Sequence, residues 1–322
     1  MNNINTWYDY FIEALYKKHP QKSHLTEALM DLLAIEREAV YRRLRNDVAF
    51  TAHEIVKIAS AWDISLDEIL GIHSQQIQMF KAVLLQYVNP SKQEIQAMRR
   101  MIDFLETFSA VPTAEYMEVS NVLPRSLITG YPFLARYYIF KWACQYNNDD
   151  NILPFCRVAH SDQIRQIGLD YYRVIKQIPI TNYIWDYKLF DYLVSDIQYF
   201  TSIYLITEDE KQLIKNDLLA LLDYMSEVSS KGYFPETGNN INLYISQLNI
   251  DTNYNYFYSD TTKLCRIRAF VKYDFSSTNE EMTTNFRSWM NLKKRSSINI
   301  SGVDEKSRIE YFMKQRQLVE TL

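Results

Sequence analysis

The chain has 322 residues, of which 47% are apolar and 23% are charged, and its formal net charge at pH 7 is −4. This length allows two or three domains, and the composition is that of a globular protein. The negative charge argues against a protein that coats nucleic acid with its whole surface, because such proteins are normally basic. Three cysteines without a CxxC pair favour reduced thiols, and no apolar stretch is long enough to span a bilayer, so we expect a cytoplasmic protein.

The segment up to residue 71 is expected to contain five short helices joined by connections of a few residues. Apolar side chains recur along it at helical spacing, and Pro20 ends the first helix. Thr51 and Glu54 have the spacing of a capping box, so a helix should begin there. The expected helices span 7–19, 23–35, 36–45 and 51–64, and a fifth begins at Ser65.

From about residue 75 to 230 the helical spacing continues in longer pieces. The expected helices are 74–88, 91–109, 132–147, 160–177, 183–205 and 208–229. No fixed-period similarity supports a helical-repeat solenoid. Aromatic residues crowd 136–142 and 182–192, which favours packing in a core, with an aromatic pocket or a dimer interface as the alternative.

After the segment 231–240 the pattern changes from helical spacing to alternation. β-branched and aromatic residues predict strands in 241–250, 253–258 and 263–275, followed by helices in 276–295 and near 304–320. Arg266, Arg268 and Lys272 share one side of the strand 264–273. A solvated sheet face is the preferred interpretation of that side, and contact with a partner or an anionic ligand is the alternative.

These patterns predict a mainly α protein. We expect an N-terminal five-helix domain (1–73), a helical oligomerisation or sensor region (74–232) and a small α+β part with a short antiparallel sheet (233–322).

The stretch "EAVYRRLRND" (38–47) concentrates three arginines in an acidic chain. If 36–45 is a helix, Val40 and Leu44 lie four residues apart and face inward. Arg43, three residues after Val40, is expected to be partly shielded. The side chains expected to point outward are Arg37, Glu38, Tyr41, Arg42 and Arg45.

Residues 26–70, about a fifth of the chain, resemble the lambda-repressor/Cro-like (XRE-type) helix-turn-helix domains. "TEALMDLLAI" is similar to the first motif helix of that family, and "IVKIASAWDISLDEIL" is similar to its common ending. "AVYRRLRND" resembles the recognition helix of a subgroup of long regulators. The resemblance implies that the helix 36–45 lies in the major groove of DNA, where arginines such as Arg42 and Arg37 bond to base edges. It also implies that Thr26 contacts a phosphate.

The chain departs from the family pattern in three places. Thr26 stands where the family often has Gln, Ala34 stands where the turn has Gly, and Asn46-Asp47 stands where Asn-Gly follows the recognition helix. Ala34 would be strained if the turn requires a positive φ.

Residues 1–71 carry eight Lys or Arg against eleven Asp or Glu, a net charge of −3. The general attraction to phosphate is therefore weak, so tight binding predicts a homodimer on two half-sites. The aromatic-rich helices between 132 and 205 are the expected interface.

Motifs of catalysis are missing from the sequence. The six glycines are scattered and form no phosphate-binding loop, and the five histidines have no ligand spacing. We therefore expect neither enzymatic activity nor a metal or other cofactor.

The sequence thus predicts a transcriptional regulator that binds double-stranded DNA through Thr26, Arg37, Glu38, Tyr41, Arg42 and Arg45. A small-molecule or protein effector would act on the C-terminal region, and no membrane partner is expected. The alternative is a protein–protein adaptor, in which a vestigial helix-turn-helix packs against a partner and never touches DNA.

Overall fold

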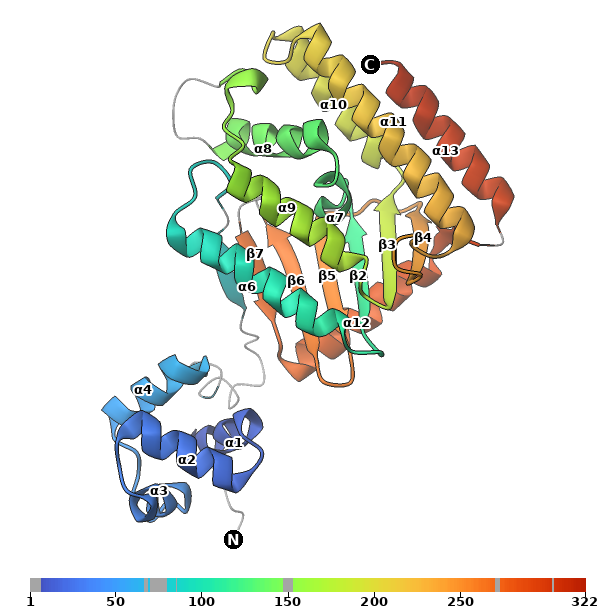
Figure 1. The fold of residues 1–322 in the computed structure, drawn as a ribbon. Coiled ribbons are helices and arrows are strands. Elements are labelled where there is room, and N and C mark those ends of the chain that lie inside the picture. Colours follow the sequence, from blue (N-terminus) through green and yellow to red (C-terminus); the bar gives the residue numbers. More distant parts are fainter. Residues whose placement is uncertain are drawn as a thin grey trace. The chain divides into compact units, whose positions relative to one another are not determined.

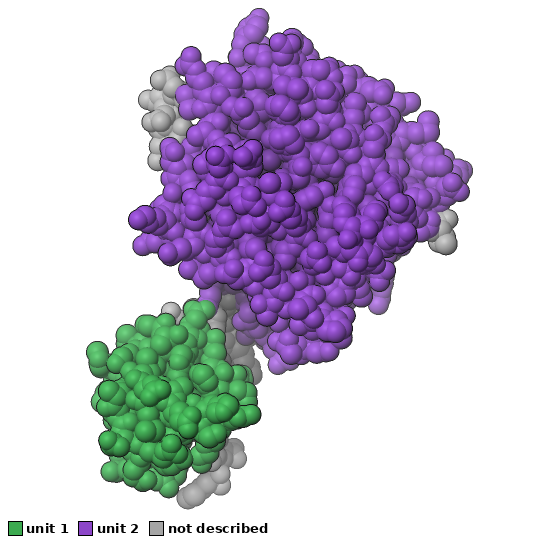
Figure 2. Space-filling view, in the orientation of Figure 1, with its two compact units in different colours: residues 1–79 green, residues 80–322 purple. Residues whose placement is uncertain are grey.

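The computed structural model describes residues 7–66, 69, 80–84, 86–146, 153–269, 273–302 and 304–322. Contacts divide the chain into two compact units, residues 1–79 and 80–322 (Figure 2). Each unit has its own apolar core. Within the described ranges, no helix combines the length and apolar character that crossing a membrane would require.

The N-terminal unit is helical, and its described helices confirm the first four expected ones to within a few residues (Figure 1). Thr51 and Glu54 form the expected capping box. The expected fifth helix falls largely on residues 67, 68 and 70, which lie outside the described residues. The helices are α1 (Trp7–Lys18), α2 (Lys22–Leu33), α3 (Arg37–Leu44) and α4 (Ala52–Trp62).

The C-terminal unit is built on one mixed sheet with the strand order β1-β7-β6-β5-β2-β3-β4-β8. The three neighbours β2, β3 and β4 are parallel, and every other pairing is antiparallel. The strands are β1 (Lys81–Leu84), β2 (Glu115–Ser120), β3 (Ile180–Asp186), β4 (Asn240–Ser246), β5 (Asn253–Tyr258), β6 (Lys263–Ala269), β7 (Tyr273–Ser277) and β8 (Ser297–Asn299).

Helices cover both faces of this sheet (Figure 1). On one face, the side chains of Tyr116, Tyr183 and Phe257 join the core that most of the helices complete. On the other face, α12 (Glu280–Arg295) packs Phe286 and Met290 against the strands. The helices of the first face are α6 (Lys92–Ser109), α7 (Arg125–Ile128), α8 (Pro132–Tyr146), α9 (Asp162–Ile175), α10 (Leu189–Ser202), α11 (Glu208–Lys231) and α13 (Glu305–Glu320), with a 3-10 turn η1 (Phe155–Arg157).

The predicted fold class is wrong, because an eight-stranded mixed sheet makes this an α/β fold and not a mainly α one. Strands β2 and β3, which lie in the region predicted to be helical, form the centre of the sheet together with strands from beyond residue 232. The expected helix 74–88 contains the strand β1, and the expected helix 183–205 overlaps most of β3. Neighbouring residues of β3 are buried on opposite faces, Tyr183 and Ile184 both at 0% exposure. A strand buried on both faces shows no alternation between apolar and polar residues.

The aromatic-rich segments confirm the core interpretation, since Phe140, Trp142, Tyr183 and Trp185 are all buried. The interpretation of the arginine side of β6 as a solvated face is wrong. Arg266 is only 8% exposed, and Arg268 is shielded almost as well because helices cover this face of the sheet. Lys272 lies outside the described residues.

Candidate nucleic-acid interface

Helix α3 is seated in the N-terminal unit by its two inward residues. Val40 is completely buried and Leu44 is 9% exposed. They belong to one apolar cluster with Leu29 of α2 and Ile58 of α4. The expected phase of this helix is therefore confirmed, and the opposite face of α3 is turned to solvent.

The connection between α2 and α3 is a tight turn at residues 34–36. Ala34 ends α2 in the left-handed conformation, with φ 54° and ψ 47°. The expected positive φ is therefore present, and Ala34 is strained because its Cβ crowds the backbone in this conformation. Asn46, after α3, also has a positive φ of 63°, which asparagine tolerates better than most residues.

Arg43 does not point to solvent but holds α3 to α4. Its Nε and Nη2 donate to the two carboxylate oxygens of Glu54 at 3.1 and 2.9 Å, and its Nη1 donates to the carbonyl of Ala39 at 3.2 Å. Burial alone would raise the pKa of Glu54, but the hydrogen bonds from Arg43 and from the Thr51 amide hold that pKa below its ordinary value. The same carboxylate thus completes the cap of α4 and anchors α3.

Tyr8 of α1 links α3 to the segment that precedes α4. The hydroxyl of Tyr8 donates to the carbonyl of Arg43 and accepts from the amide of Phe50, both at 3.0 Å. Burial raises the pKa of Tyr8, so the hydroxyl keeps its proton and its role as a donor. Both the backbone and the side chain of Arg43 are therefore occupied inside the unit.

Helix α3 exposes Arg37, Glu38 and Arg42, and the residue that caps its C-terminus, Arg45, is exposed as well. Arg37 lies 3.9 Å from Glu27, and Arg45 lies 3.5 Å from Glu38 and 3.2 Å from Asp47. These side chains are more than half exposed, so the pairs are weak and can be exchanged for other charges. For Arg42, the described residues provide no ion pair.

Tyr41 and Thr26 differ from the other expected contacts. Tyr41 is half-buried, and the Nζ of Lys22 lies 5.7 Å from the centroid of its ring. Thr26 is 0% exposed, and its hydroxyl donates to the carbonyl of Lys22 at 2.7 Å. A buried hydroxyl that is already bonded one turn back along its helix does not reach a phosphate unless α2 moves.

The structure adds Lys22 to this surface, a residue that the sequence interpretation left out. It is exposed in the first turn of α2 and lies beside Tyr41 of α3. A helix N-terminus offers free amides and a partial positive charge to an anion. Its position directly before the expected start of a motif helix was the signal in the sequence.

No protein-family profile, no curated protein and no solved structure matches this chain.

Proposed function

We propose that the N-terminal unit is a sequence-specific DNA-binding domain that reads the major groove with α3, and that the chain is a cytoplasmic transcriptional regulator. The proposal is supported by the different surroundings of the arginines in and next to α3. Arg43 fixes the helix through Glu54, while the side chains of Arg37, Arg42 and Arg45 are exposed. Bidentate contacts to guanine require a helix that is held in place and that exposes guanidinium groups.

The contact set proposed here is Arg37, Glu38, Tyr41, Arg42 and Arg45, with Lys22 added at a phosphate. Arg42 comes first for bases because no described carboxylate competes for it. Arg37 and Arg45 would exchange their exposed carboxylate partners for phosphate or base atoms, at little cost. The resemblance to lambda-repressor/Cro-like domains is a resemblance of sequence, and the tight turn at Ala34 agrees with it.

The regulator is proposed to act as a homodimer, since one short helix carries too little discrimination for a single site. Most of the expected aromatic interface lies in the core. The surface of α10 and the turn after it still exposes Tyr192, Tyr199, Ile203 and Tyr204, and these side chains offer apolar area to a second copy.

A protein–protein adaptor is the second candidate, and one observation favours it. Arg37 and Arg45 already have acidic neighbours within their own unit, whose net charge is negative. A surface of mixed charges suits a protein partner better than a polyanion.

Selection from a pool of random DNA duplexes tests the proposal against this alternative. The full chain is incubated with the pool at about 100 mM salt, and the bound duplexes are amplified and sequenced over several rounds. We expect enrichment of one motif, with two-fold symmetry if the protein binds as a dimer. A pool that stays random through all rounds would favour the adaptor.

A further inference from the structure

A cluster of charged side chains lies beneath the helices on one face of the C-terminal sheet. Asp274 of β7 lies 3.0 Å from the Nε of Arg268 and 3.5 Å from the Nη1 of Arg266. Burial alone would raise the pKa of Asp274, but the two arginines lower it to about 2. This carboxyl group is therefore ionised at neutral pH, and it balances one of the two guanidinium groups.

Arg125, the first residue of α7, brings a third guanidinium group to this cluster. Its Nη1 donates to the hydroxyl of Tyr87 at 2.5 Å, and its guanidinium lies over the rings of Tyr87 and Tyr171. Its positive charge contributes to the low pKa of Asp274. Among the described residues, no carboxylate lies within ion-pair distance of Arg125.

A second carboxylate reaches the cluster only through intermediaries. Glu118 accepts a hydrogen bond from the hydroxyl of Tyr116, which itself accepts from Asn255, and the carbonyl oxygen of Asn255 accepts from Arg266. In the described part of the chain, the linked group thus has three guanidinium groups and two carboxylates. An excess of positive charge inside a protein raises the free energy of the folded state unless an anion accompanies it.

A small cavity lies beside Arg125, the arginine of this group that has no carboxylate partner among the described residues. It measures about 20 Å³, enough for a single water-sized group. Arg125, Tyr87 and Tyr138 line this cavity, and the hydroxyl of Tyr138 accepts a hydrogen bond from Arg268. His160 and Arg165 also line it, and the side chain of Arg165 is 60% exposed.

From this arrangement we infer that the cavity, here called the Arg125 cavity, binds the anionic end of a small ligand, a carboxylate or a phosphate group. One oxygen of that group enters the cavity and accepts from Arg125. Arg165 meets the remaining charge at the rim, where its exposed pair with Asp162 is easily exchanged. Arginine with tyrosine hydroxyls is a donor set suited to such oxygens. The site does not depend on whether the N-terminal unit binds DNA.

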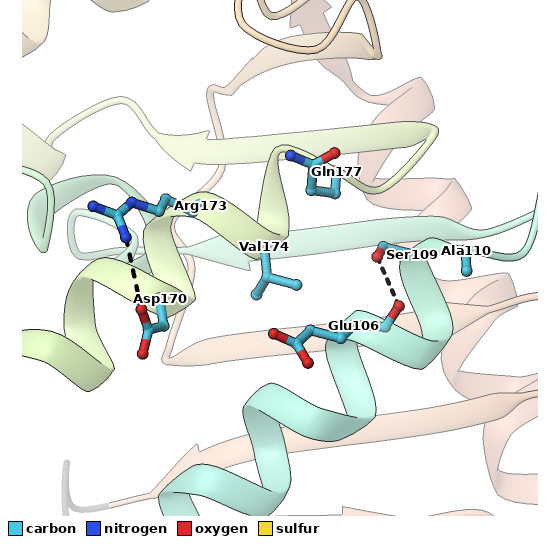
Figure 3. A pocket seen from close by; sticks show the side chains of 7 residues that line it. All are labelled: Glu106, Ser109, Ala110, Asp170, Arg173, Val174 and Gln177. Carbon is cyan, nitrogen blue, oxygen red and sulfur yellow. Dashed lines mark hydrogen bonds and ion pairs between the residues drawn. The ribbon is translucent and has the colours of Figure 1, made fainter.

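A larger groove between α6 and α9 lacks this unbalanced charge. It measures about 550 Å³ and is lined by Glu106, Asp170 and Arg173 among others (Figure 3). Asp170 is paired there with both Arg99 and Arg173. Together with Arg99, the groove has two arginines and two carboxylates, so its charges balance and do not select a ligand of either sign.

His160 provides a spectroscopic probe within the Arg125 cavity. Burial lowers its pKa, and the positive charges of Arg165 and Arg136 lower it further. An anion bound beside it would stabilise the protonated imidazole and raise that pKa.

The test is thermal unfolding of the full chain at constant ionic strength, with chloride replaced stepwise by phosphate or by acetate. We expect a saturable rise in Tm with at least one of the two anions, because a ligand of the folded state stabilises it. A response to phosphate alone identifies a phosphate group, and a response to acetate alone identifies a carboxylate. Arg125→Gln should abolish the response, and Arg165→Gln should raise the half-saturating concentration several-fold.

Arg100→Gln, which removes an exposed arginine of α6 outside the cavity, is the matched control and should respond like the wild type. A Tm that follows ionic strength alone overturns the inference, as does an Arg125→Gln variant that responds like the wild type. If Arg125→Gln does not fold, the imidazole proton resonances of the wild type decide. His160, assigned by a His160→Gln variant, must titrate at higher pH with the saturating anion, and an unchanged titration overturns the inference.

Discussion

Two arginines that follow one another in the sequence have different roles in this protein. Arg42 is exposed on α3, whereas the next residue, Arg43, is bonded to Glu54 and to the carbonyl of Ala39. The sequence indicated this difference, because Arg43 is three residues from the buried Val40. What the sequence did not show was the identity of the partner, since Glu54 lies on another helix and its spacing indicated only a capping role.

Removing the Arg42 side chain should weaken DNA binding and leave stability nearly unchanged. For Arg42→Ala we expect a loss of about 1–3 kcal/mol in the affinity for a selected duplex. The melting temperature should hardly move, since the side chain is exposed. Anisotropy titrations measure the affinity. Lys57→Ala, which removes one exposed positive charge on α4, is the control, and an equal loss in both variants would mean that Arg42 contributes only general charge.

Glu54 should make the N-terminal unit sensitive to acid. Its pKa is lowered in the folded state, so its ion pair stabilises the fold above the ordinary pKa of an unfolded glutamate. That contribution is lost as the pH falls from there through the lowered pKa. For Glu54→Gln we expect a loss of about 1.5–3 kcal/mol at pH 7 and a weaker acid dependence than in the wild type. Urea unfolding of residues 1–79 at several pH values measures both, and parallel pH profiles would contradict this role.

At the level of the elements, the sequence predicted the helices of the N-terminal unit well because each is apolar on one side. Residues such as Leu25, Leu29, Val40 and Leu44 recur at helical spacing and are buried. The parallel strands could not be predicted in this way. In β2, the neighbours Tyr116 and Met117 are buried against opposite layers, and the polar Glu118 is buried as well. The strand therefore has no exposed side from which its period could be read.

The turn between α2 and α3 offers a stabilising substitution. Ala34 adopts a left-handed conformation, which costs a residue with a Cβ about 1–2 kcal/mol. Glycine removes that cost, although its greater freedom in the unfolded chain takes back about 0.4–1 kcal/mol. Ala34→Gly should therefore stabilise residues 1–79 by roughly 0.5–1 kcal/mol. Urea unfolding measures this change, and a destabilised variant would mean that the turn has another conformation in solution.

The packing of α3 against α2 and α4 should depend on Leu44. Leu44→Ala is expected to destabilise the N-terminal unit by about 2–5 kcal/mol, since a buried side chain leaves a cavity. Substituting the exposed Val56 of α4 by Ala is the matched control and should cost little. If both variants unfold at the same urea concentration, α3 is not anchored through this residue.

For the whole molecule, we expect the C-terminal unit to form the dimer and the N-terminal unit to bind DNA, and the oligomeric state tests the first of these roles. The aromatic content that predicted an interface lies largely in the core of the C-terminal unit, and only side chains such as Tyr192 and Tyr199 remain exposed on α10. We still expect the full chain to sediment as a dimer and residues 1–79 to sediment as a monomer with much weaker DNA binding. A full chain that is monomeric at micromolar concentration and yet binds a half-site tightly would rule out this arrangement.

The central claim is that the exposed face of α3 reads DNA, and the salt dependence of specific binding tests it most directly. The affinity of the full chain for a selected duplex and for a scrambled duplex is measured by anisotropy between 50 and 200 mM salt. We predict that the selected duplex binds at least ~10³-fold more tightly. Its log affinity should also fall linearly with log salt as arginines displace counterions. Equal affinities for the two duplexes, or an affinity that salt does not change, would contradict the claim.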